Sequence, residues 1–254
     1  MIPIIARHEF LKLFRTGKIW QLLALCQFIL GLIFYWLMEE YLFKKQQFLL
    51  ENNSSFGITE EVIHPLFAWT ALLFFFITPL LATNSITQER KSHTLELYLI
   101  APISATEIVL GKFIGVFLGQ VFLLLPVFLM PLIICLQDRL DVGQLLTGSF
   151  GLILLISANL SIGIFISSLA KEPLIAALAI FTTLILLSLL EWMGRFLTPS
   201  LQWITELALL YHCKNLLSGL ISSKDVIYYG SLSLVFIYFS IVRLNKEPHF
   251  KKKS

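Results

Sequence analysis

The amino-acid sequence predicts an all-α, polytopic membrane protein, and three observations support this fold class: composition, the length of the apolar runs and the placement of charge. Hydrophobic residues make up 57% of the 254 residues and charged residues 14%, whereas typical soluble domains have about 45–50% and about 25%. The mean hydropathy is +0.83. So little polar surface argues against a soluble enzyme, a nucleic-acid-binding domain and a disordered chain.

Six stretches are long and apolar enough to span a membrane as helices. A hydrocarbon core about 30 Å thick needs about 20 apolar residues per helix, and backbone groups in lipid must bond within their own segment. The short alternating stretches of a membrane barrel are not seen. We expect one transmembrane domain, residues 1–254, with spans at 19–38, 65–86, 104–135, 144–170, 173–191 and 226–242.

Lysine and arginine are distributed unequally between the two sides of this arrangement. With the N-terminus in the cytoplasm, 13 of the 19 basic residues lie on the cytoplasmic side and six outside, whereas 6 of the 16 acidic residues lie inside and 10 outside. The net charge is then +7 inside and −4 outside, as the positive-inside rule requires. Six spans return the chain to its starting side, so both termini are expected in the cytoplasm.

Residues 1–18 precede the first span and combine apolar with basic side chains. A helix here would have an apolar stripe and a basic face, the pattern of a helix that lies in the headgroup layer. We expect such an interfacial helix; a basic flank that only sets the topology is the alternative. The apolar positions are Ile4, Ile5, Phe10, Leu11, Leu13 and Phe14, and the basic ones are Arg7, His8, Lys12 and Arg15.

The third span begins with three glycines spaced four residues apart, Gly111, Gly115 and Gly119. This spacing places all three on one helix face, so we expect another backbone to approach closely there. Gln120 in this span and Asn159 in the fourth are expected to hydrogen-bond between helices rather than to line a substrate path.

Residues 192–225 are the longest segment expected outside. Apolar residues spread through it predict one or two short helices, re-entrant or interfacial, that are too short to cross the membrane. The histidines of the chain lie near span ends or in loops, and we expect each to be an unliganded surface side chain: His8, His64, His93, His212 and His249.

No set of residues with catalytic or metal-ligating spacing stands out. Gly111 and Lys112 do not form a phosphate-binding loop, because Phe113 follows where Ser or Thr is required. The three cysteines lack metal-ligand spacing. We therefore predict that the chain is not an enzyme and has no catalytic residue, metal ion or cofactor.

The segment at residues 87–103 joins the second and third spans on the cytoplasmic side. It predicts a short charged helix from Glu89 to Ile100, then a turn at Pro102. Ser104 and Glu107 have the spacing of a capping box at the start of the next helix. A short amphipathic helix in this place would suit the docking of a cytoplasmic partner; an ordinary connector is the alternative.

With these residues, the segment resembles the permease subunits of type-2 ABC transporters. Their pattern is an acidic–basic pair, a Gly-Thr-Leu-Glu element, a Pro turn followed by Ser, and an acidic residue with Gly-Lys at the start of the next span. The chain departs from it at His93, where the family usually has Gly. The matching residues are Glu89, Arg90, Thr94, Leu95, Glu96, Pro102, Ser104, Glu107, Gly111 and Lys112.

A second resemblance covers the end of the outer segment and the start of the last span. It is similar to the gliding-motility and nitrous-oxide-reductase-maturation branch of these permeases. The matching residues are His212, Asn215, Leu216, Gly219, Asp225, Tyr228 and Tyr229.

The resemblance implies a six-helix subunit in the bacterial cytoplasmic membrane, paired with a second copy or a sister permease over two cytoplasmic ATPase subunits. Membrane lipids are further expected partners, and nucleic acid is not. Residues 1–18 would be the elbow helix and residues 192–225 would close the exit. Pro102, Glu107 and the three glycines would turn and pack the helices. The resemblance places the ATPase-coupling interface at Glu89, Arg90, Thr94, Leu95 and Glu96.

The expected function is therefore to couple ATP hydrolysis in separate subunits to export or translocation. A membrane anchor or scaffold that holds a partner complex without transport is the alternative, because it too needs only helices and a docking loop.

Overall fold

The computed structural model describes residues 1–50, 57–91, 103–134, 141–194, 206–217, 219–220 and 222–246. Within these ranges every regular element is helical. In chain order they are α1 (Ile2–Arg15), α2 (Lys18–Leu50), the π-helical turn η1 (Thr59–Ile63), α3 (His64–Thr83), α4 (Thr87–Lys91), α6 (Ala105–Ile134), α7 (Val142–Leu169), α8 (Pro173–Gly194), α9 (Leu209–Leu217) and α10 (Ser223–Asn245).

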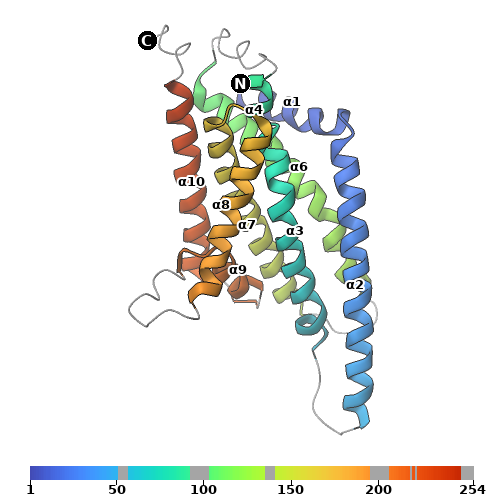
Figure 1. The fold of residues 1–254 in the computed structure, drawn as a ribbon. Helices are drawn as coiled ribbons and strands as arrows, with labels where there is room; N and C mark the ends of the chain where they lie inside the picture. Colours follow the sequence, from blue (N-terminus) through green and yellow to red (C-terminus); the bar gives the residue numbers. More distant parts are fainter. Residues whose placement is uncertain are drawn as a thin grey trace.

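Six stretches of the described chain are long and apolar enough to cross a membrane, and they contain α2, α3, α6, α7, α8 and α10. They run side by side as a bundle (Figure 1). This confirms the predicted all-α, polytopic fold. Helix α1 lies across one end of the bundle, the same end at which α10 finishes, and α9 lies at the opposite end (Figure 1).

The spans form an inner and an outer group. Helices α3 and α7 are the most buried, whereas α2, α8 and α10 are the least buried. The interior is made of large apolar side chains such as Phe67, Phe74 and Leu155. Small residues allow α3 and α7 to approach each other closely. A Cβ added to Gly163 of α7 would lie 2.7 Å from the Cβ of Ala82 in α3. Such small-residue contacts are typical of membrane helices, whose association depends on tight packing.

Helix α2 is longer than the sequence predicts. It continues from the predicted end at residue 38 to Leu50, and its far end extends beyond α3 (Figure 1). The residues that follow are good helix formers without Gly or Pro. Lys44 also pairs with Glu40 at 2.9 Å, one turn earlier, and with Glu61 of η1 at 2.8 Å. These ion pairs support a helix outside the apolar stretch.

A sharp turn at Gly17 joins α1 to α2. Its φ is +69°, in the left-handed region that glycine adopts at low cost. The amides of Thr16 and Gly17 donate to the carbonyls of Lys12 and Phe14 at 3.1 and 3.3 Å and so close the end of α1. This turn lets α1 lie across the bundle while α2 runs along it.

The polar residues inside the spans have different surroundings. Gln120 of α6 donates from Nε2 to Thr78 Oγ1 of α3 at 3.1 Å, which confirms the predicted hydrogen bond between helices. Asn159 of α7 is fully buried, and neither of its amide atoms has a hydrogen-bond partner among the described residues.

Candidate functional site

The candidate site is the place where the chain leaves α3 and meets α1, α6 and α7. The short helix α4 starts here and contains the first residues of the predicted coupling segment. We call this place the α4 junction and define it by side chains from four helices: Glu9 and Lys12 of α1, Thr87, Glu89 and Arg90 of α4, Lys112 of α6, and Ser167 and Ser168 of α7.

Four charged side chains form an ion network at the centre of the α4 junction, and all of them except Lys12 are buried. Lys112 Nζ donates to Glu9 Oε1 at 2.7 Å and to Glu89 Oε2 at 2.5 Å. Lys12 Nζ donates to Glu89 Oε1 at 2.6 Å and lies 3.7 Å from Glu9 Oε2. Lys112 is 0% exposed, Glu9 3% and Glu89 4%. Among the described residues, two acids and two bases meet here, which is the pairing that buried charges need.

Helix geometry brings Glu9 into this network. Residues three or four apart share a helix face, and Glu9 shares its face with the buried side chains of Ile5, Ala6 and Leu13. The apolar stripe of α1 therefore includes one acid, and that acid faces a lysine from α6. This network joins residues 77 and 103 positions apart in the chain.

Helix α1 packs against the three glycines of α6. An added Cβ would lie 2.7 Å from Ile5 Cβ at Gly111, 2.6 Å from the carbonyl oxygen of Ala6 at Gly115, and 2.6 Å from Leu13 Cδ1 at Gly119. Real Cβ atoms do not approach other atoms so closely, so Gly111 and Gly115 are required for this packing, whereas at Gly119 the end of the Leu13 side chain could move aside. The glycine face brings α1 close enough for Glu9 to reach Lys112.

On its other side, α4 is bonded to the end of α7. Thr87 Oγ1 donates to the carbonyl of Ser167 at 2.8 Å, and the Thr87 amide donates to Ser167 Oγ at 3.1 Å. Arg90 donates to the carbonyls of Ala170 at 2.7 Å and Ser168 at 3.0 Å. The last carbonyls of a helix have no partner within it, and a cation beside them interacts well with the helix dipole. Arg90 thus caps α7 from a neighbouring helix.

The start of α6 is closed by its own residues. The Ser104 amide donates to Glu107 Oε2 at 3.1 Å, and the Glu107 amide donates to Ser104 Oγ at 3.3 Å. This is the reciprocal arrangement of a capping box. The N-terminal amine of Met1 lies 3.4 Å from Glu107 Oε1, so the start of α1 also contacts the start of α6.

The predicted coupling residues are thus only partly described. Glu89 and Arg90 belong to the α4 junction, and both side chains are bonded within the bundle. Glu107 and the glycines lie along the α6 side of the same junction. The remaining residues of the prediction lie outside the described residues: Thr94, Leu95, Glu96 and Pro102.

Sequence reasoning missed Glu9, Lys12 and the burial of Lys112. A signal was present in α1, because Glu9 interrupts an apolar stripe on a helix whose other charged residues are basic. No local pattern indicates which distant residue neutralises such an acid, since its partner lies in another helix.

A second polar cluster lies at the opposite end of the bundle and corrects the prediction for His212. This side chain was expected at the surface, but it is 7% exposed. Its Nδ1 lies 2.6 Å from Asp225 Oδ1, and its Nε2 lies 2.8 Å from the carbonyl of Glu206. The ring also stacks on Tyr228 at 4.1 Å. The prediction was wrong because a histidine in a loop segment can be buried when α10 supplies a carboxylate.

This outer cluster, His212 with Asp225, Tyr228 and Tyr229, ties α9 to α10. Tyr229 donates its hydroxyl to the carbonyl of Leu209 at 2.6 Å and Tyr228 donates to that of Leu207 at 2.7 Å. Four residues of the second resemblance therefore meet in one place. Helix α9 has only nine residues, so it is one short helix that cannot span a membrane.

The described residues of the α4 junction form a mechanical connection between helices. Helix α4 is held by ion pairs to α1 and α6 on one side and by hydrogen bonds to α7 on the other. A displacement of α4 must therefore move these three helices or break buried charged contacts. Breaking one such contact costs about 3–5 kcal/mol.

One comparison with known proteins bears on this arrangement. The sequence pattern described as "ABC-2 family transporter protein" matches residues 3–245, which is nearly the whole chain. No protein with a curated description matches it.

Proposed function

The chain belongs to the family of ABC-2 transporter proteins and is a multi-pass permease subunit, and from this premise we propose that it couples ATP hydrolysis to export. The ATP would be hydrolysed by separate ABC ATPase subunits, which the family implies as partners. The cargo would cross the cytoplasmic membrane of a bacterium.

The observation that carries this proposal is the double attachment of α4. The ion pairs of Glu89 with Lys12 of α1 and Lys112 of α6, and the hydrogen bonds to α7, connect α4 to three other helices. In our proposal an ATPase subunit pushes or pulls residues 87–103, and α4 passes that motion into the bundle. Glu89 and Arg90 then act as positioning residues, whereas Thr94, Leu95 and Glu96 make the contact with the ATPase.

This mechanism requires that the α1 end of the bundle faces the cytoplasm. The excess of Lys and Arg on that side supports this orientation. Helix α1 and the end of α10 lie at this same end (Figure 1), as expected if both termini are cytoplasmic. In this orientation α1 is the elbow helix at the headgroup layer, and α9 with the outer cluster lies at the exit.

We also propose that the permease works as a pair, with a second copy or a sister permease, and that lipids cover its remaining apolar surface. The exposed faces of α2, α8 and α10 leave ample apolar area for both. The meeting of His212, Asp225, Tyr228 and Tyr229 in the outer cluster supports assignment to the gliding-motility and nitrous-oxide-reductase-maturation branch.

Purification from native membranes tests the proposal. We expect an ATP-hydrolysing subunit to copurify with the chain, and we expect Glu96→Ala to lower permease-dependent ATP hydrolysis at least fivefold while the complex stays assembled. Glu172→Ala is the matched control, because Glu172 is an exposed acid at the same end of the bundle. A stable complex without any ATPase would contradict the proposal and favour the scaffold alternative.

A further inference from the structure

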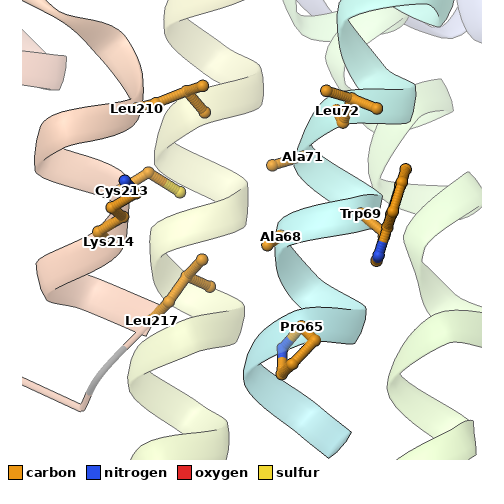
Figure 2. A pocket seen from close by; sticks show the side chains of 9 residues that line it. All are labelled: Pro65, Ala68, Trp69, Ala71, Leu72, Leu210, Cys213, Lys214 and Leu217. Carbon is orange, nitrogen blue, oxygen red and sulfur yellow. The ribbon is translucent and has the colours of Figure 1, made fainter. Parts of the chain in front are cut away.

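An apolar groove lies between α3 and α9 (Figure 2), and α9 lies at the end of the bundle opposite α1 (Figure 1). The volume of the groove is about 340 Å³. Small-molecule sites usually have volumes of about 300–1,000 Å³, so this groove is at the small end of that range. The lining residues are Pro65, Ala68, Trp69, Ala71 and Leu72 of α3 and Leu210, Cys213, Lys214 and Leu217 of α9.

Small side chains on α3 open the groove. Ala68 and Ala71 face α9, from which Leu210, Cys213 and Leu217 point back toward them (Figure 2). Ala71 and Cys213 are each 1% exposed and close the bottom of the groove. Ala68, in the wall of the groove, is exposed, so the groove opens to the surface of the described chain.

One charged side chain lies at the edge of this apolar surface. Among the described lining residues, Lys214 is the only one with a charge, and it is exposed. Trp69 is also exposed, at 42%. Tryptophan and lysine at the end of an apolar span are typical of the boundary between membrane and water. The groove therefore combines walls suited to hydrocarbon with a cation at headgroup level.

We propose that this groove binds the single acyl chain of an anionic amphiphile, with the chain between α3 and α9 and the anionic head beside the Lys214 ammonium. The groove is small enough to favour one chain over the two of a phospholipid. A polypeptide is disfavoured, because its backbone polar groups would meet almost no hydrogen-bonding partner on these walls.

This inference rests on the proposed export function, for which it supplies a substrate class. In the proposed orientation, the groove lies beside the outer cluster at the exit, where an amphiphile would leave the permease. Binding can be measured on the chain alone, without ATP or an ATPase, so it can fail or succeed independently of the coupling proposal.

Photo-crosslinking of the purified full-length chain tests the inference. The probe is hexadecanoate with a diazirine in its chain, and a hexadecyl glycoside with the same diazirine is the neutral comparison. We expect hexadecanoate to crosslink mainly to residues 65–72 of α3 and 210–217 of α9. Crosslinks spread evenly over the apolar surface would overturn the proposal.

Two pairs of variants test the walls and the charge separately. Ala68→Phe fills the groove, and we expect it to reduce crosslinking at least fivefold; Ala24→Phe makes the same change at an exposed alanine of α2 and should have no effect. Lys214→Gln should weaken hexadecanoate binding about tenfold but leave the neutral probe unchanged, whereas Lys224→Gln should change neither.

Three results would contradict the proposal. Equal crosslinking in the Ala68→Phe and Ala24→Phe variants would exclude the groove as the site. Equal binding of the neutral and anionic probes would exclude the role of Lys214. Displacement of the probe by phosphatidylglycerol at lower concentration than by unlabelled hexadecanoate would show a two-chain phospholipid site instead.

Discussion

Lys112 is a fully buried cation in an apolar bundle, and its surroundings explain how it is tolerated. A charged group in such a place is costly unless it is paired and hydrogen-bonded. Glu9 and Glu89 each accept a hydrogen bond from its ammonium group, and Lys12 supplies the second positive charge. The four described charges of this network sum to zero, so the loss of any one of them leaves the other three unbalanced.

The first prediction concerns this balance. Lys112→Met should lower the free energy of unfolding by about 3–5 kcal/mol, because Glu9 and Glu89 would stay buried with one positive charge fewer beside them. Thermal unfolding in detergent measures the change. The double variant Glu89→Gln/Lys112→Met should lose less unfolding free energy than the two single variants lose together, since Glu9 can still pair with Lys12. Additive losses would contradict the network, because coupled residues deviate from additivity.

The second prediction concerns the glycine face of α6. Gly115→Ala should destabilise the protein by about 1–3 kcal/mol, the usual cost of overpacking, because the new Cβ would lie 2.6 Å from the carbonyl oxygen of Ala6. Gly31→Ala is the control, since a Cβ on Gly31 meets nothing within 4 Å. That variant should be neutral or slightly stabilising, as alanine is the better helix former. Equal effects would mean that α1 does not pack on this face.

At the scale of single elements, the described residues of α4 are held in place by contacts with neighbouring helices. Its five residues depend on neighbours, and Arg90 supplies two of the contacts. A guanidinium holds its donors in a rigid planar fork that reaches two separate carbonyls, whereas an ammonium is compact and on a flexible stem.

The third prediction follows from this difference. Arg90→Lys should release α4 from the end of α7, and backbone amide exchange in residues 87–91 should become at least fivefold faster while exchange in α6 stays the same. Hydrogen–deuterium exchange with mass spectrometry measures both. Arg7→Lys, at an exposed arginine of α1, should have no effect. Unchanged exchange in Arg90→Lys would show that these contacts do not hold α4.

The fourth prediction concerns the attachment of α9 to α10. His212→Leu removes the described partner of Asp225 Oδ1, and Asp225 Oδ2 has none among the described residues. We expect a loss of about 1–3 kcal/mol, the cost of leaving a buried polar group unsatisfied. His8→Leu, at an exposed histidine of α1, should be nearly neutral in the same unfolding measurement. Equal stability of the two variants would contradict a structural role for His212.

The elements themselves could be predicted well from the sequence, because a membrane span depends on a local run of apolar residues. All six predicted spans correspond to helices, and only their ends differ. The contacts between elements could not be predicted, since Lys112 and Glu9 are 103 positions apart. The glycine spacing in α6 predicted a close neighbour but could not identify it as α1. His212 was misassigned for the same reason, because its burial depends on α10.

At the scale of the whole molecule, α7 connects the two ends of the bundle. At one end Ser167 and Ser168 hold α4. Toward the other end Gly151 packs so closely on α9 that an added Cβ would lie 2.7 Å from the Cβ of Leu216. In the proposed mechanism this helix carries the motion of α4 toward α9 and the groove beside it. From the sequence alone, residues 87–103 and residues 192–225 were expected on opposite sides of the membrane. The sequence did not indicate that α7 links them.

The most direct test of the central claim is ATP hydrolysis by the complex of this chain with its ATPase partner in liposomes. The complex would contain either the wild-type chain or the Glu89→Gln/Lys112→Met variant. If α4 couples the ATPase to the bundle through the buried ion network, the variant complex should stay assembled but hydrolyse ATP at least fivefold more slowly. Wild-type hydrolysis by the assembled variant complex would contradict the account.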